Sequence, residues 1–292
     1  QRQRLFWAYL SSHFCFNMKK TLSIAALLCG LCVCANAASM VTEWTGGAGP
    51  TEGNTYELGN AGNWSNGIPS RGNGQGPDVI FNNAGTVNVN GAMVDTSDGG
   101  GITVTGNSNV TVGGTRYTGN VTVGSGSTLN LGQVDFKSSD ITLDGTLNLT
   151  VCGIDPGGNG ARLVFGIGGI MNVNQKIWGA SSFSVSGLLA TTSTDLTVGE
   201  FQFVTRTLVT SAGFDGGSIS LGDFTAEDGS ALTKASGLME GNAADYQGQY
   251  YLYTENGDVK VQYVVAGVVP EPATATLSLL GLAALMLRRR RA

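Results

Sequence analysis

The acidic side chains are the residues of this sequence that suit catalysis, because paired carboxylates act as acid and base in glycoside hydrolysis. Asp140 and Asp144 flank one strand-like run. Four residues of extended chain span about 13 Å, which exceeds the roughly 5–10 Å between such carboxylates. Asp95 and Asp98 share a Ser- and Gly-rich loop, where Asp beside Gly is ordinary turn chemistry. Neither pair predicts a catalytic site.

A further acidic group lies in a Gly-rich stretch and consists of Asp215, Asp223 and Asp228. Loop carboxylates are ligands that calcium accepts, so a calcium site is one interpretation of this group. Calcium-binding solenoids, however, repeat a Gly-Gly-x-Gly-x-Asp array, and no such array occurs here. We therefore expect solvated loops, no metal site and no cofactor, with calcium as the alternative.

The N-terminal region has the three parts of a secretory signal peptide. A positive start at Met18-Lys19-Lys20 precedes an apolar run over 21–33 and a small-x-small cleavage site formed by Ala35 and Ala37. The signal peptide is thus expected over residues 18–37, with the mature chain beginning near Ala38. We interpret residues 1–17 as an upstream segment that is not translated. Export of this kind runs through the Sec translocon.

Removing these segments changes the chemistry that the chain can perform. The only histidine, His13, is lost, together with Cys15, Cys29, Cys32 and Cys34. Triads with histidine, Cys-His catalysis and histidine metal sites are then excluded. A single cysteine, Cys152, remains, so no intramolecular disulfide can form. No basic residue is near it in sequence, and we expect a buried apolar side chain in preference to a reactive thiol.

The charge of the mature body is strongly negative. The chain has 21 acidic and 16 basic residues, and the terminal segments hold one of the former and eight of the latter. The body therefore keeps 20 acidic against 8 basic residues, a net charge near −12. Such a body repels polyanions, which excludes nucleic acid as a partner.

Residues 79–210 have the period-2 pattern of β-strands, with Val, Ile or Leu alternating with Thr, Ser or Asn between Gly-rich turns. One series of runs begins at Val79, Ile102, Val121, Ile141, Leu163 and Phe183, with steps of 23, 19, 20, 22 and 20 residues. A second begins at Val87, Val110, Leu129, Leu147 and Ile170, with steps of 23, 19, 18 and 23. Two interleaved series with one period predict a coil with two strands per turn.

A repeat near twenty residues favours an all-β, parallel β-solenoid, since each coil leaves an apolar edge bare until the next coil stacks on it. In the run Val121-Thr122-Val123 the valines point to one side and Thr122 to the other. We expect the valines to line the core, and Thr and Asn to form polar ladders outside. A β-sandwich of similar strands is the alternative, because it also has a turn about every 8–12 residues.

The body ends with a predicted hairpin around Asn256-Gly257. A two-residue loop pairs Leu252 with Val261 and Tyr250 with Tyr263 on a core face. It pairs Tyr253 with Lys260 and Tyr251 with Gln262 on the other face, which either caps the solenoid or offers stacking for a sugar. The same pairing sets Glu255 against Asp258, and we expect a wider loop or frayed ends to relieve this repulsion.

The last segment, residues 269–292, differs in composition from the body. Pro270, Glu271 and Pro272 precede an apolar run over 273–287, and the chain closes with Arg288, Arg289, Arg290 and Arg291. Fifteen helical residues rise about 22 Å against a hydrocarbon core of about 30 Å, so the predicted transmembrane helix is a marginal anchor. The arginines stay cytoplasmic and the prolines keep the motif extended outside. A permanent tail anchor is the alternative.

This tail resembles the PEP-CTERM sorting signal of Gram-negative bacteria. The resemblance implies export, a transient inner-membrane intermediate, processing near Pro270, Glu271 and Pro272 by an exosortase, and delivery to the cell surface or exopolysaccharide matrix. In the body, the stretch from Val112 to Val123, with Gly114-Thr115-Arg116-Tyr117-Thr118-Gly119, resembles the autotransporter-associated β-strand repeat. Trp44-Thr45-Gly46-Gly47 with Asn63-Trp64-Ser65 is similar to the segment that opens such passengers.

The sequence therefore predicts an opening cap over 38–78, solenoid repeats over 79–210, a C-terminal β cap over 211–268 and the sorting signal over 269–292. The expected function is that of a surface or matrix protein with a structural or adhesive role and no enzymatic activity. A carbohydrate-active enzyme (a polysaccharide lyase or hydrolase) or a carbohydrate-binding protein on the same scaffold is the alternative. Convergence of three or more acids in a groove would favour the enzyme.

Overall fold

The computed structural model describes residues 41–69, 78–90, 100–117, 119–136, 139–154, 161–178, 183–215 and 219–268. In these ranges the regular structure is β, apart from two short 3-10 turns, η1 (Ala61–Asn63) and η3 (Ala243–Tyr246). The predicted all-β class is confirmed. The predicted signal peptide, with Ala35 and Ala37, the predicted mature start at Ala38, and the tail from Pro270 to Arg291 lie outside these ranges. No helix that is long and apolar enough to span a membrane occurs within them.

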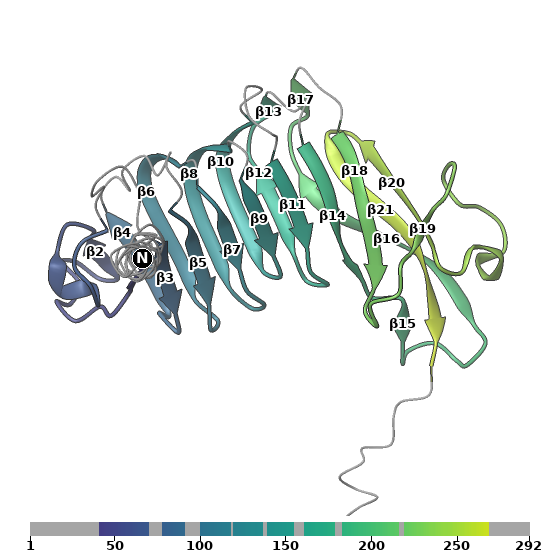
Figure 1. Ribbon diagram of the computed structural model, residues 1–292, viewed down its shortest axis with the longest axis horizontal. Coiled ribbons are helices and arrows are strands. Elements are labelled where there is room, and N and C mark those ends of the chain that lie inside the picture. Colours follow the sequence, from purple (N-terminus) through teal and green to yellow (C-terminus); the bar gives the residue numbers. More distant parts are fainter. Residues whose placement is uncertain are drawn as a thin grey trace, which may run out of the picture. The chain divides into compact units, whose positions relative to one another are not determined.

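The strands form two sheets, and the chain alternates between them (Figure 1). The first sheet contains, in spatial order, β1 (Val41–Glu43), β3 (Asp78–Asn82), β5 (Ile102–Thr105), β7 (Val121–Val123), β9 (Asp140–Leu143), β11 (Ala161–Phe165), β14 (Phe183–Leu189) and β18 (Ile219–Ala226). Every pair of neighbours in it is parallel.

The second sheet begins with a parallel series and ends with an antiparallel one. The parallel series is β2 (Thr55–Glu57), β4 (Thr86–Asn90), β6 (Asn109–Tyr117), β8 (Thr128–Phe136), β10 (Thr146–Ile154), β12 (Ile170–Val173) and β16 (Phe201–Thr210). β21 (Asp258–Gly267) then pairs antiparallel with both β16 and β20 (Gln249–Glu255), and β19 (Thr233–Lys234) lies at the edge. The long parallel ladders are consistent with a β-solenoid and differ from the antiparallel sheets of a β-sandwich.

The predicted series of strand positions is confirmed for most of its length. In the first sheet, Val79, Ile102, Val121, Ile141 and Leu163 face one another in turn. In the second, Val87, Val110, Leu129 and Leu147 do the same.

The last member of each predicted series is confirmed as the start of a strand, since β14 begins at Phe183 and β12 at Ile170, but neither residue continues its column of facing residues. Leu163 faces Val185, while Phe183 faces Ala161. Leu147 faces Met171, while Ile170 faces Thr146. A shift of one residue turns every side chain of a strand to the opposite face, and Met171 is fully buried whereas Ile170 is half-buried. The side of the strand that faces the core, and not the first apolar residue of the run, sets this register.

The prediction of two strands per coil agrees with the described strands from β3 and β4 to β9 and β10, whereas the coil that begins with β11 and β12 adds a third short strand, β13. The first half of β10 pairs with β12, and Cys152 and Gly153 in its second half pair with β13 (Ile177–Trp178). β13 pairs in turn with β17 (Phe214–Asp215). The second half of β10 therefore pairs with a different strand from its first half. In the nine-residue strand β8 the alternation of buried residues breaks between Leu131 and Val134, and in β10 it breaks between Leu149 and Cys152.

The core is a continuous column of buried apolar side chains between the ladders. Its largest fully buried members are Phe81, Phe136, Phe165, Phe224, Ile102, Leu129, Ile141, Leu143, Leu147 and Leu149. Burying one such side chain stabilises a fold by about 1.5–3 kcal/mol relative to leaving it exposed. Because each coil buries its apolar edge on the next, the two terminal coils need other cover.

Aromatic rings cover the N-terminal end of this column. Trp44 lies edge-on to Tyr56 and to Trp64, with ring centroids 4.9 and 5.0 Å apart, and it also contacts Phe81. The Trp64 indole N–H donates to Leu58 O at 2.9 Å. The parallel ladder already starts in this segment, since β1 pairs with β3.

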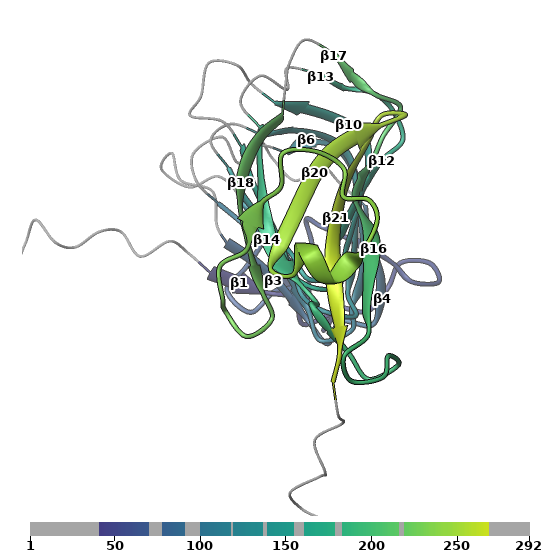
Figure 2. The same cartoon turned by 90° about the vertical axis from the view of Figure 1, so that its right-hand side faces the viewer.

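The C-terminal end is covered by the predicted hairpin. All of its pairs are confirmed, including Leu252 with Val261 and Tyr253 with Lys260, and Asn256 and Gly257 have φ of 53° and 91°, as a type I′ turn requires. In Figure 2, β20 and β21 lie between β16 and β18. The Tyr250 hydroxyl donates to Gly222 O of β18 at 3.2 Å, which ties the hairpin to the first sheet.

The expected widening of the hairpin loop is wrong. Glu255 and Asp258 pair directly. Lys260 Nζ lies 2.7 Å from Glu255 Oε2 and 4.0 Å from Asp258 Oδ2, so one ammonium group compensates both carboxylates and the tight turn is kept.

The Arg206 side chain of β16 supplies hydrogen bonds that the backbone of a further coil would otherwise supply at the turn between the two sheets. At four successive turns, a backbone carbonyl accepts from the first strand N–H of the next coil: Gly85 O from Asn109, Ser108 O from Thr128, Ser127 O from Thr146 and Gly145 O from Ile170. Gly169 O is the next in this series, and it accepts from Arg206 Nη2 at 2.5 Å. The same nitrogen donates to Gly166 O at 2.7 Å, and Nη1 donates to Leu188 O at 3.3 Å.

We expect Arg206→Met to lower the free energy of unfolding by about 3 kcal/mol, because it removes charge-assisted bonds to carbonyls that no further coil reaches. Urea denaturation of the body without its terminal segments measures this change. Arg162→Met is the matched control, since it makes the same substitution at an ion pair that is exposed and contributes little. Equal losses in the two variants would contradict the capping role of Arg206.

Candidate functional site

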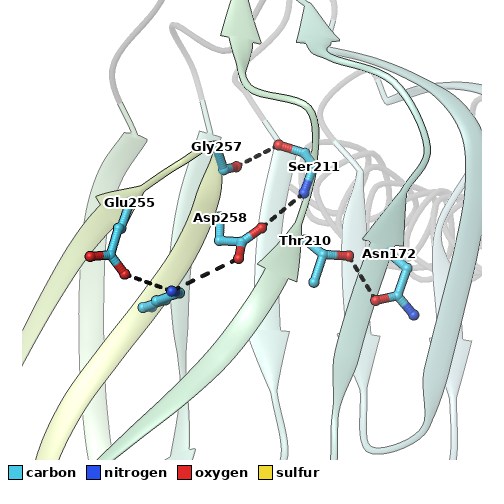
Figure 3. A network of polar contacts seen from close by, with 7 residues as sticks. Asn172, Thr210, Ser211, Glu255, Gly257 and Asp258 are labelled. Carbon is cyan, nitrogen blue, oxygen red and sulfur yellow. Dashed lines mark hydrogen bonds and ion pairs between the residues drawn. The ribbon is translucent and has the colours of Figure 1, made fainter.

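A ladder of amide and hydroxyl groups on the outer face of the second sheet is the most extended polar feature of the described residues. We call Asn130, Asn148, Asn172 and Thr210 the amide ladder. Asn148 Nδ2 donates to Asn130 Oδ1 at 2.7 Å, and Asn172 Nδ2 donates to Asn148 Oδ1 at 2.8 Å. Thr210 Oγ1 donates to Asn172 Oδ1 at 2.8 Å (Figure 3). The predicted polar ladder is thus confirmed.

The parallel pairing explains why these residues meet. Asn130, Asn148, Asn172 and Thr210 occupy consecutive register positions, so identical side chains stand one strand spacing apart, about 4.8 Å. Asn130 Nδ2 continues the ladder toward Asn109 Oδ1, Val110 O and Thr111 Oγ1. These amides bind one another, the Thr210 hydroxyl is bonded to Asn172, and the ladder contains no ionisable side chain.

The amide ladder connects directly to the hairpin at the end of the body. Ser211 follows Thr210, and its hydroxyl donates to Gly257 O at 2.6 Å, while its N–H donates to Asp258 Oδ1 at 3.4 Å. Figure 3 shows these contacts together with Glu255 and Asp258, whose carboxylates lie 2.7 and 4.0 Å from Lys260 Nζ. Polar contacts therefore run from the parallel coils into the terminal turn.

Among the side chains that the structure describes, the acids singled out from the sequence do not assemble into a site. Asp140 accepts two bonds from Arg162, at 2.7 and 2.6 Å, and this contact lowers the pKa of the Asp140 carboxyl. Asp144 lies in the turn between β9 and β10, and its carboxylate occupies the space beside Gly166. The two carboxylates therefore engage different neighbours.

Of the other acids, Asp215 is the last residue of β17, Asp223 lies in β18 and Asp228 lies in a turn. Asp228 Oδ1 accepts from Ser230 N at 2.8 Å, and bonds from Ser230 lower the pKa of its carboxyl. Asp223 is exposed, and Asp95 and Asp98 are outside the described ranges. No group of three or more His, Cys, Asp or Glu side chains that could hold a metal ion occurs in the part of the chain that the structure describes.

The outer face of the hairpin holds the tyrosines considered for sugar stacking. Tyr251 and Tyr253 have near-parallel rings with centroids 5.9 Å apart. Gln262, opposite Tyr251, is buried, and its side chain donates to Met239 O at 3.1 Å and accepts from Met239 N at 2.8 Å. The loop around Met239 thus covers part of this face, and the tyrosine pair lies at the edge of the covered area.

Cys152 is a buried, free thiol, as the sequence predicts. Burial raises the pKa of this thiol to about 12, and the nearby Asp135 carboxylate adds to the effect. Thiolate is the reactive form of cysteine, so this side chain acts as a small apolar residue of the core.

Sequence reasoning missed Arg206. Its sequence context, Val204-Thr205-Arg206-Thr207-Leu208, reads as an ordinary strand with an outward cation. The carbonyls that it binds belong to Gly166, Gly169 and Leu188, which are 18 to 40 residues distant in sequence. The one available signal is that an arginine interrupts the alternation of the last long strand before the cap.

The comparisons with known proteins concern the tail. A family profile described as the PEP-CTERM protein-sorting motif matches residues 268–291. The match includes the Pro-Glu-Pro sequence at 270–272, the apolar run and the four arginines at 288–291. This motif implies an exported protein that is sorted by an exosortase through a membrane-anchored intermediate. No curated protein and no solved structure matches the chain. The similarity of the body to the autotransporter-associated repeat receives no support from these comparisons and stays a prediction.

Asn130→Asp should lower the free energy of unfolding by about 1–3 kcal/mol, because a carboxylate cannot donate to Asn109, Val110 and Thr111. Chemical denaturation of the variant and of the parent body gives the difference. The exposed Asn54 offers a control with the same chemical change, Asn54→Asp, that we expect to be close to neutral. A neutral Asn130→Asp would show that the amide ladder adds no stability.

Cys152 should resist alkylation in the folded protein. With a thiol pKa of about 12, almost no thiolate is present at pH 8, and the side chain is inaccessible as well. Mass spectrometry after iodoacetamide treatment should show no adduct in native buffer and one adduct in urea. Rapid labelling of the native protein would mean that the coil around Cys152 opens readily.

Proposed function

We propose that this chain is a structural or adhesive component of the bacterial cell surface or exopolysaccharide matrix, to which exosortase sorting delivers it. The observation that carries the proposal is the match of residues 268–291 to the PEP-CTERM motif directly behind a folded β body. Pro270, Glu271 and Pro272 act as a recognition sequence for another enzyme. Export occurs through the Sec translocon, and residues 273–287 with Arg288–Arg291 hold the protein transiently in the inner membrane.

The polar side chains of the body support a structural role. The amides of the ladder bind one another, and Arg162 and Lys260 are paired with carboxylates. Groups engaged in this way stabilise a scaffold, whereas a catalytic site keeps groups available for substrate. We therefore propose a body without enzymatic activity and without a cofactor.

A carbohydrate-binding role is the second candidate, and the observation in its favour is the stacked Tyr251–Tyr253 pair at 5.9 Å. Aromatic rings contribute apolar area at binding surfaces. Retention of the purified body on immobilised exopolysaccharide, with loss of retention in Tyr251→Ala and Tyr253→Ala, would favour this role over a purely structural one.

Sorting is tested by Glu271→Ala in the native host. We expect the parent protein to lose the residues after the sorting motif, to be released from the inner membrane, and to do both only when the exosortase is present. Glu271→Ala should stay full-length and membrane-bound, because the recognition sequence is altered. Intact mass and membrane fractionation measure both effects.

Glu240→Ala is the control for this experiment, since Glu240 is an exposed acid of the body and its loss should leave processing unchanged. If the tail of the parent protein stays intact both with and without the exosortase, the sorting proposal is wrong and a permanent tail anchor is favoured.

A further inference from the structure

The chain is hydrogen-bonded to the body as far as Val268, the first residue of the region that the sorting-motif profile matches. Ala266 N donates to Thr191 O at 2.9 Å, Gly267 N to Glu200 O at 3.0 Å and Val268 N to Ser193 O at 3.0 Å. β15 (Thr192–Ser193) lies beside the end of β21 and pairs with Ala266 and Gly267 (Figure 1). We call residues 191–193 and 196–200, together with the strand end 266–268 that they hold, the exit clamp.

The exit clamp is tightly packed around Gly267. A Cβ atom at this position would lie 2.0 Å from Thr197 O and 2.8 Å from Leu196 O, so only glycine fits between β15 and the loop that follows it. That loop is braced from within, because Thr197 N donates to a Glu200 carboxylate oxygen at 2.8 Å and Glu200 N donates to Thr197 O at 2.9 Å.

The exit clamp ends very close to the recognition sequence. Pro270 follows Val268 after one intervening residue, a chain length of at most about 7 Å. Enzymes that bind an extended peptide use its backbone N–H and C=O groups in a strand-like pairing. The N–H groups of Ala266, Gly267 and Val268 are already bonded within the body.

We propose that the exit clamp controls processing of the sorting motif: residues 266–268 must leave their partners before the sorting enzyme can pair with the chain upstream of Pro270. This inference rests on the proposed function, since it assumes a processing enzyme that acts near Pro270–Pro272. Local opening of a strand end costs less than global unfolding, so the body stays folded while the clamp opens. The stability of the clamp then sets the processing rate.

The direct test inserts Gly-Ser-Gly-Ser-Gly-Ser between Val268 and Val269 of the full-length protein in the native host. The enzyme can then pair with the inserted residues while the exit clamp stays closed, and we expect processing to be about ten-fold faster. Pulse-chase labelling with intact-mass detection measures the rate. The control is the same insertion between Gly53 and Asn54, two exposed turn residues between β1 and β2, and it should leave the rate unchanged.

A second variant opens the exit clamp without a linker. Gly267→Ala forces a methyl group against Thr197 O and should also speed processing, whereas Gly237→Ala meets no atom within 4 Å and should not. Hydrogen exchange on the body is an independent readout. The amides of Gly267 and Val268 should be protected in the parent and lose protection in Gly267→Ala, while the amides of β8 and β10 keep theirs.

The possible outcomes separate this inference from the sorting proposal. An insertion after Val268 that leaves processing unchanged or slows it would overturn the control by the exit clamp, even when Glu271→Ala abolishes processing. Absence of processing in the parent and in every variant, with unchanged amide protection, would refute the sorting proposal and with it the role of the clamp.

Discussion

Parallel stacking of successive coils is the constraint on which the rest of this structure depends. Each coil presents one row of apolar side chains inward and one row of backbone hydrogen-bonding groups toward its neighbour, so it is complete only when another coil covers it. The in-register columns, such as Val87, Val110, Leu129 and Leu147, satisfy this requirement along the body. The amide ladder uses the same register on the outside, where the repeat places equal side chains at hydrogen-bonding distance.

The two ends of the stack require different solutions, because nothing continues the repeat there. At the N-terminal end, the rings of Trp44, Tyr56 and Trp64 cover the first coil. At the other end, the chain reverses into an antiparallel hairpin, and Arg206 supplies to Gly169 O the donor that the next coil would have supplied. Both covers shield the apolar ends of the core from water.

The same reversal also determines where the last described strand, β21, ends. The hairpin strand β21 runs back along the second sheet and ends between β15 and the loop at Thr197. The chain that leaves the body therefore does so from a bonded strand end, with Val268 still attached to Ser193. In the proposed role of the exit clamp, the stability of this bonded strand end sets the rate of the sorting event.

The sequence by itself determined the local features of this protein. Strand class, the repeat near twenty residues, the polar ladder, the turn at Asn256-Gly257 and the sorting motif all depend on neighbouring residues or on a short period, and such patterns are visible in one dimension. Only the tertiary structure decided the register at Met171 and Val185, the third ladder through Cys152 and Ile177, the compensation of Glu255 and Asp258 by Lys260, and the capping by Arg206. These features depend on which side chains the core can bury and on which donors reach which carbonyls across distant coils, and spacing along the chain does not encode either.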